Sequence, residues 1–435
     1  MCERNLARQV GTSVESKLLP ACEGPCPTFP LRSNPLESAP RTTRPLLLGL
    51  IAVLVLLPVT LPVPVLRGLV RERFEVSVFL TSLFMSVNMI GAFLTAPIIG
   101  ALSDRTGRRR AWIVNALLLD ALCFLAMTQD LPFWAFLALR FVEGCAHIAA
   151  LSLLLTVASD TARTRSSGVV MGMVGSGITL GVAFGAALGG QLGNEDPLLP
   201  LRGAAVVDAI TACFVGAFLL EAERGESRPG LGRIVAALKS ERGLLVPWLY
   251  AFVDRFTVGC FVTAFPLWMS EVHGLEPKRT GLLLAAFLVP FGVLSYPAGR
   301  LGERWSRTRM LVYGSAIYGV GLCSLGWWSV PSLPYVMVGL GIVSAVMFVP
   351  SLMLTQDLAP PDARSTAMGG FNAAGSIGFV FGPLVVATVI QWLGGNEPDH
   401  DAFSGAFAVA GVTEIACALG TFALLRRLVL GGRST

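Results

Sequence analysis

The sequence predicts an all-α membrane protein with twelve transmembrane helices in two pseudo-symmetric six-helix bundles. Composition, the length of the apolar segments and an internal repeat lead to this fold class. Of the 435 residues, 54% are hydrophobic and only 14% are charged, whereas about 25% of a soluble domain is charged. Each apolar segment has roughly 18–25 residues, enough to cross about 30 Å of hydrocarbon as a helix.

The spans can be placed directly on the sequence. They are apolar on all sides and lack the alternating pattern of a membrane barrel. The first six are expected near 45–66, 76–101, 111–128, 132–157, 167–192 and 203–221. The second six are expected near 244–270, 280–299, 310–329, 332–355, 366–392 and 403–425.

Around these spans, the chain is predicted to have an amino-terminal tail at 1–44. The tail is rich in Pro, Ser, Arg and Cys and has no long apolar stretch, so we expect it to be disordered. Cys22 and Cys26 have no second Cys/His pair nearby and are not expected to bind metal. The remaining parts are a bundle at 45–221, a charged linker at 222–243, a bundle at 244–425 and a tail at 426–435.

Lys and Arg are concentrated in the amino-terminal tail and in alternate loops. The positive-inside rule assigns these segments to the cytoplasmic side of a cell membrane, so both termini are expected there. The net charge of +5 belongs to these loops and to their contact with anionic lipid. We therefore expect no nucleic-acid partner, and we expect the protein to be a monomer.

The two halves of the chain are related in sequence. Residues 100–110 (GALSDRTGRRR) and 299–309 (GRLGERWSRTR) share glycine, leucine, an acid and arginines at matching positions. Residues 181–186 (GVAFGA) likewise match 378–383 (GFVFGP). Carriers built from such repeats bind substrate between the halves, near the bilayer midplane.

These motifs resemble those of the major facilitator superfamily. Residues 100–110 resemble its loop motif G-x-L-x-D-R-x-G-R-R/K, and residues 140–144 (RFVEG) the R-x-x-Q/E-G motif of its proton-coupled members. Residues 181–190 (GVAFGAALGG) are similar to the antiporter motif G-x-x-x-G-P-x-x-G-G, with Ala186 replacing its proline, and 57–64 (LPVTLPVP) also looks like the drug:proton antiporters. The resemblance covers all twelve helices and implies proton-driven efflux of a small organic compound by alternating access.

The repeat predicts two charge clusters at the cytoplasmic ends of the helices. An arginine held between two acids satisfies its planar fork, and we expect Arg108 and Arg307 to occupy this central place. The resemblance implies that such clusters hold the inner ends of the halves together in one transport state. The predicted gating residues are Asp104, Arg105, Arg108, Asp160, Glu303, Arg304, Arg307 and Asp357.

Small residues repeat on the fifth and eleventh spans. Glycines four residues apart share one helix face, where another helix can approach closely. The face is interpreted as a static packing seam and also, as the resemblance favours, as a smooth bending or sliding interface between the halves. The residues of this predicted hinge are Gly181, Gly185, Gly189, Gly190, Gly378, Gly382 and Pro383.

Ionisable residues inside the spans are candidates for the proton and substrate pathway, because burial of charge is costly. Arg140, Glu143 and His147 fall along one stripe of the fourth span, and Glu143 is predicted to bind the proton. Asp254 and Arg255 are adjacent on the seventh span and point about 100° apart, so at least one of them should face the cavity.

Three other acids lie within spans but are expected to have lesser roles. Asp120 and Glu414 stand on helices that are peripheral in the resembled family, which suggests local packing contacts. Asp208 is expected to reach toward the outer interface. The first span has no charge at all, which argues against the cationic-drug preference that some relatives derive from a carboxylate there.

Several functions stay open at this point. A secondary active exporter leads, with an importer or facilitator of a metabolite as the alternative within transport. A carrier-like sensor or assembly protein that does not transport is a third reading. An enzyme is not expected, because the chain has no nucleophile elbow, zinc-protease motif or P-loop. The predicted partners are a small-molecule substrate, protons and lipid, with no cofactor and no metal.

Overall fold

The computed structural model describes residues 44–106, 108–164, 167–220, 242–359, 364–395 and 397–431. These residues contain no strand, and twelve of their helices are long and apolar enough to cross a membrane. The predicted fold class is confirmed. Nearly all of the predicted tail at 1–44 and of the linker at 222–243 lies outside the described residues.

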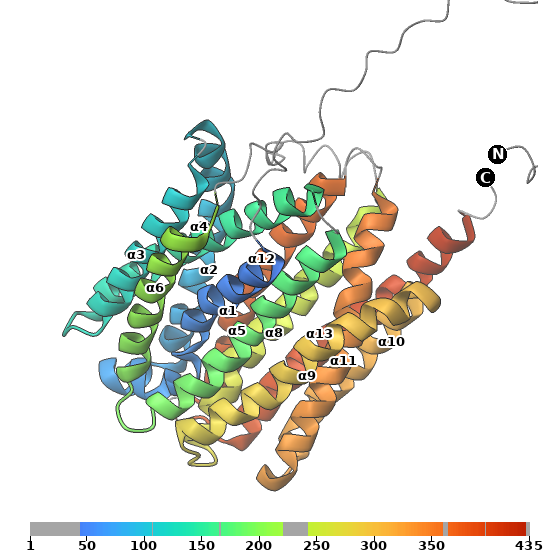
Figure 1. Ribbon diagram of the computed structural model, residues 1–435. Helices are drawn as coiled ribbons and strands as arrows, with labels where there is room; N and C mark the ends of the chain where they lie inside the picture. The colour runs from blue at the N-terminus through green and yellow to red at the C-terminus, as the bar shows by residue number, and fades with distance from the viewer. Residues whose placement is uncertain are drawn as a thin grey trace, which may run out of the picture. The chain divides into compact units, whose positions relative to one another are not determined.

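Each half of the chain contributes six spanning helices (Figure 1). The first six are α1 (Pro45–Thr60), α2 (Val78–Thr106), α3 (Arg109–Met127), α4 (Phe133–Thr164), α5 (Ser167–Leu192) and α6 (Leu199–Phe218). The second six are α8 (Leu245–Glu271), α9 (Pro277–Arg304), α10 (Arg307–Ser324), α11 (Leu333–Leu358), α12 (Arg364–Gly394) and α13 (His400–Gly431).

The first span differs from the continuous helix expected over 45–66. Its α-helical part ends at Thr60, and the chain continues as a 3₁₀ turn, η1 (Val63–Val65), and a π-helical segment, η2 (Arg67–Glu72). Pro62 and Pro64 explain the change, because proline has no N–H for the helical ladder. The resulting bend carries η2 across the end of the bundle.

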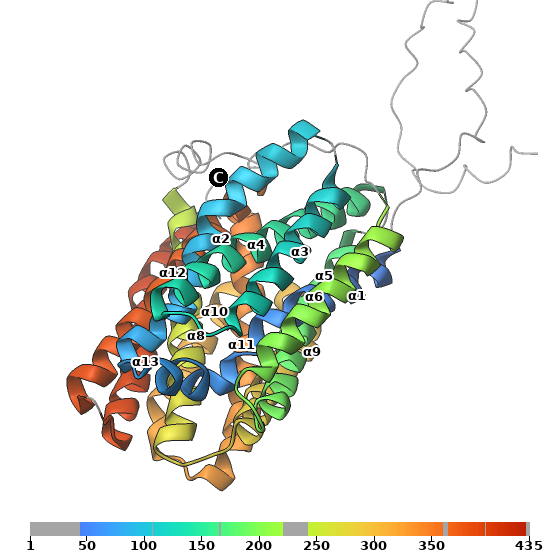
Figure 2. The same cartoon turned by 90° about the vertical axis from the view of Figure 1, so that its left-hand side faces the viewer.

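The two halves repeat one packing scheme. In the first half α1 packs on α5, α2 on α4, and α3 on α6; in the second α8 packs on α12, α9 on α11, and α10 on α13. The halves meet through α5 with α9 and through α2 with α12. In Figures 1 and 2, α3 and α6 accordingly lie on the other side of the bundle from α10 and α13.

The apolar core is shared by the halves at one end of the bundle only. We call the end with Arg109 and Arg307 the basic end, and the end with η2 the opposite end. At the opposite end one buried cluster contains side chains of both halves, such as Leu61 and Trp268. Toward the basic end the first half has its own buried cluster, and the second half has two more. The halves are thus packed together at the opposite end and have separate cores at the basic end.

Candidate functional site

A buried polar cluster surrounds the stripe predicted on α4. Arg140 and Glu143 are at most 1% exposed, and the Arg140 Nη1 atom lies 2.9 Å from Glu143 Oε2. The Asn88 amide of α2 donates to the same oxygen at 2.5 Å. The Arg140 guanidinium also stacks 4.2 Å from the centroid of the Phe84 ring, and its Nε donates to the Phe84 carbonyl oxygen at 3.3 Å. Glu143 is therefore held in place from two helices.

The same cluster includes two acids that the sequence analysis assigned to packing or to the interface. Asp120 of α3 is fully buried, with Oδ2 3.7 Å from Nδ1 of His147. Asp208 of α6 is also fully buried, so the expectation that it reaches the interface is wrong. Neither of its carboxyl oxygens has a hydrogen-bond partner among the described residues. The bundle covers Asp208 because α6 packs on α3, and it lies close enough to Asp120 and Glu143 for mutual repulsion.

A second buried pair of acids lies in the other half. Asp254 of α8 is 4% exposed and Glu414 of α13 is fully buried. Glu414 accepts hydrogen bonds from Ser315 of α10 and, at 3.4 Å, from Thr257. Arg255, the next residue after Asp254, is exposed instead. The two neighbours thus point in different directions, as their spacing on a helix requires.

The charged residues at the basic end pair within each half. Arg109 forms an ion pair with Asp160, and Arg307 forms one with Asp357. The predicted pairing of Arg108 with Asp160 is therefore wrong: Arg108 precedes the first residue of α3 and is exposed, whereas Arg109 begins the helix and pairs with Asp160 of α4. Both described pairs join neighbouring helices of one half, α3 with α4 and α10 with α11.

The other predicted gating residues are Arg304, Asp104, Arg105 and Glu303. Arg304 is exposed. The side chains of Asp104, Arg105 and Glu303 lie outside the part of the structure that is described. Their gating role remains a prediction.

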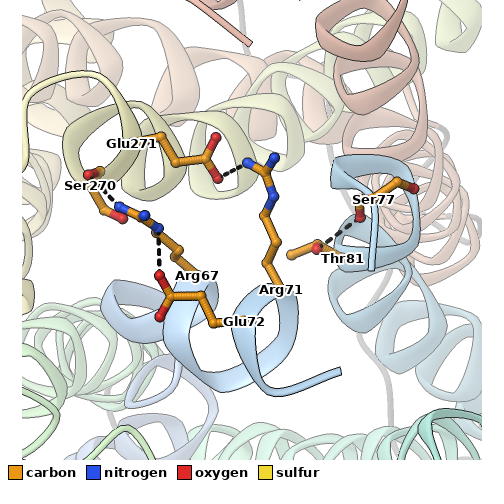
Figure 3. Close-up of polar contacts among 7 residues, drawn as sticks. All are labelled: Arg67, Arg71, Glu72, Ser77, Thr81, Ser270 and Glu271. Atoms are coloured by element: carbon orange, nitrogen blue, oxygen red, sulfur yellow. Dashed lines mark hydrogen bonds and ion pairs between the residues drawn. The ribbon is translucent and has the colours of Figure 1, made fainter. Parts of the chain in front are cut away.

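Among the described residues, the ion pair between the halves lies at the opposite end, on η2 (Figure 3). Arg71 forms an ion pair with Glu271 at the end of α8, and the two side chains are only 18% and 8% exposed. Arg67 donates to the Ser270 carbonyl oxygen at 2.8 Å and also pairs with Glu72 at 2.9 Å. These residues were not among those predicted from the sequence. The available signal was a group of arginines at 67–73 on the side that otherwise has few.

Comparison with known proteins decides the family. A sequence model of the Major Facilitator Superfamily matches residues 48–249 and 247–432 of the chain. The chain belongs to this superfamily. The family recognised from the loop and helix motifs is therefore confirmed, and the protein is a multi-pass membrane protein of a transporter family.

Curated relatives of the superfamily include drug-resistance proteins. The class C tetracycline resistance protein of Escherichia coli is 26% identical over 352 residues, covering 76% of this chain and 85% of that protein. Multidrug resistance protein 2 of Bacillus subtilis is 32% identical over 133 residues, covering 30% of this chain and only 33% of that protein.

Solved structures show the same fold at low identity. The nucleoside transporter NupG superposes with a TM-score of 0.73 at 12% identity, covering 88% of this chain and 98% of that chain. A bacterial homologue of the human lysosomal transporter Spinster, in an inward-facing and unoccupied conformation, superposes with a TM-score of 0.69 at 14% identity, covering 88% and 94%.

The predicted glycine face of this superfamily member packs inside one half. A Cβ atom on Gly181 would lie 2.9 Å from the Leu56 Cβ, and one on Gly185 or Gly189 would collide with α1 backbone. On α12, Gly378 and Gly382 approach α8 in the same way, and Pro383 packs against Gly259. These residues form close seams within each half, where α1 meets α5 and α8 meets α12.

Gly190 differs from the rest of the glycine face, because its neighbours belong to the other half. A Cβ atom added to Gly190 would collide with Pro277 of α9 and would lie 3.1 Å from the Gly281 Cα. The interpretation of the whole face as a sliding interface between the halves is therefore wrong for Gly181, Gly185 and Gly189. It is compatible with Gly190 alone.

Proposed function

We propose that the protein is a secondary active transporter that exports a small organic compound in exchange for protons. The observation that supports this most is the buried cluster of Asp120, Glu143 and Asp208, in which Arg140 supplies the single guanidinium. Three buried carboxyl groups in a cluster with one arginine and one histidine leave excess negative charge, and burial of uncompensated charge is costly. We infer that the cluster holds at least one exchangeable proton, with Glu143 as its primary site.

The arrangement of the cores supports alternating access. Because the halves share a core only at the opposite end, we infer that the described state is closed there and open toward the basic end. The basic end is proposed to face the cytoplasm, with both termini, in a cell membrane. The drug-resistance relatives favour the export direction.

Import of an organic acid is the second candidate. A probable L-galactonate transporter of Escherichia coli is 28% identical over 161 residues, covering 37% of this chain and 34% of that protein. The 3-(3-hydroxy-phenyl)propionate transporter of the same species is 24% identical over 353 residues, covering 79% and 86%. Their names favour a carrier for organic acids.

A vesicle experiment separates these functions. The protein is reconstituted into lipid vesicles that enclose a pH-sensitive dye. A library of compounds that includes tetracycline and organic acids is then added under an imposed pH gradient. Exchange predicts that a transported compound drives protons in the opposite direction, whereas import with protons predicts the same direction. Flux that persists unchanged when the pH gradient is collapsed would contradict proton coupling.

The ion pair at the opposite end gives a prediction about the closed state. Glu271→Gln removes the carboxylate that pairs with the largely buried Arg71 and should shift the population away from closure by about tenfold. The distance between spin labels at Glu75→Cys and Glu276→Cys should lengthen, since these exposed sites lie in different halves. Glu72→Gln is the matched control. Glu72 pairs with Arg67 of the same segment, η2, and both side chains are exposed. Such exposed pairs contribute about 0–1 kcal/mol. Equal distance distributions for both variants would show that the Arg71–Glu271 pair does not stabilise the closed state.

A further inference from the structure

Arg255 has an environment that no other deeply placed charge shares. It lies ten residues into α8, about 15 Å along the helix and so near the membrane midplane. Among the described residues, Asp120, Arg140, Glu143, Asp208, Asp254 and Glu414 are buried at comparable depth. Arg255 is exposed. An exposed guanidinium at this depth faces a water-filled cavity, because contact with hydrocarbon is too costly.

The surroundings of Arg255 come from three other helices of its half. The guanidinium carbon lies 5.4 Å from the ring centroid of Phe348 on α11. The Phe348 ring in turn meets Phe291 of α9 edge-on, with centroids 5.7 Å apart and planes at 73°. On α12, a Cβ atom at Gly375 would come within 3.0 Å of the Arg255 Cγ, so the glycine leaves room for the arginine stem. The exposed guanidinium thus lies against two half-buried phenylalanine rings.

Arg255 forms no ion pair among the described residues. Its neighbour Asp254 is buried and interacts electrostatically with Arg255, but it also interacts with Glu414 of α13. The whole of α1 is uncharged, and the mid-span acids of the first half, Asp120, Glu143 and Asp208, are buried in their own cluster. A guanidinium that is positioned by an aromatic ring and forms no ion pair presents its planar donors to a ligand.

We propose that Arg255 binds the anionic group of the transported compound, and that Phe348 and Phe291 contact its apolar or aromatic body. The substrate class is therefore an organic acid with an aromatic or similarly flat apolar part. The planar fork of arginine suits a carboxylate bidentately, and the ring faces suit such a body. This proposal rests on the proposed transport function and names its substrate class.

Binding to the purified full-length protein in neutral micelles tests the proposal with matched probes. The probes are 1-naphthoate, 1-naphthamide and 1-naphthylmethylamine, together with benzoate and benzamide. The acids should bind about 10- to 100-fold more tightly than their amides, and the amine should bind most weakly. Arg255→Gln should abolish this preference, and Arg255→Lys should retain part of it. Phe348→Ala should weaken acid and amide alike.

Arg300→Gln is the control, because Arg300 also lies over an aromatic ring, 4.9 Å from the Tyr296 centroid, but at the basic end of α9. It should leave the preference for acids unchanged. Equal binding of acids and amides, tightest binding of the amine, no acid binding at all, or an unchanged preference in Arg255→Gln would each overturn the proposal. Displacement of naphthoate by phosphatidylglycerol, with no acid-driven flux in vesicles, would assign Arg255 to lipid and also overturn it. In each case proton coupling measured with other compounds could still stand.

Discussion

Replacing Glu143 by glutamine is expected to reduce proton-driven flux to the level of protein-free vesicles, while substrate exchange at equal pH persists. Glutamine preserves the shape of the side chain and can still accept from Asn88, but it cannot bind and release a proton. Uptake is measured against pH in vesicles, with counterflow as the measure of exchange. The wild-type protein should show a steep pH dependence, and the variant should show none.

The variant also leaves the Arg140 charge without its partner at 2.9 Å. Breaking a buried pair from one side costs about 3–5 kcal/mol, so a loss of flux must be separated from a loss of fold. Arg140→Gln combined with Glu143→Gln removes both charges and should recover thermal stability without recovering proton coupling. Asp196→Asn, in an exposed pair 3.7 Å from Arg202, is the neutral control. Unchanged pH dependence in the Glu143 variant would show that another group carries the proton.

The spans and the internal repeat could be predicted from sequence because both are local properties. Hydrophobic length is set by the bilayer, and an arginine-rich motif between two spans is distinctive. The partners of a helix are not local. Asp208 stands in the middle of α6 (Leu199–Phe218), and its burial depends on α6 packing against α3. Nothing in the sequence around Asp208 specifies that contact.

Predictions about individual partners failed for the same reason. Arg108 and Arg109 are one residue apart, yet a step of one residue turns a helix by about 100°. Only the start of α3 at Arg109 decides which of them meets Asp160. Similarly, the spacing of Gly181, Gly185 and Gly189 predicts a close helix neighbour but does not identify that neighbour as α1.

The close neighbours of Gly185 make this glycine a sensitive position in the seam. Gly185→Leu should abolish transport and lower thermal stability while the protein still inserts in the membrane. The new side chain would meet the Leu57 carbonyl oxygen and the Thr60 hydroxyl, and that hydroxyl donates to the Val182 carbonyl oxygen at 2.9 Å. Overpacking of this kind costs about 1–3 kcal/mol. Expression, thermal stability and counterflow are measured together. Full stability with normal flux would contradict the close packing of Gly185 against α1.

Two further glycines of α5 show whether the effect comes from the seam or from the interface between the halves. Gly175 has no atom within 4 Å of an added Cβ, so Gly175→Leu should keep wild-type stability and controls for helix propensity. Gly190→Leu should instead push Pro277 and Gly281 of α9 away. Because those residues belong to the other half, each half stays intact and the closed opposite end should open. Gly190→Leu should therefore lengthen the distance between labels at positions 75 and 276, whereas Gly185→Leu should not. If Gly185→Leu lengthens that distance as much, then α1 and α5 move relative to each other during transport, and the seam is not static.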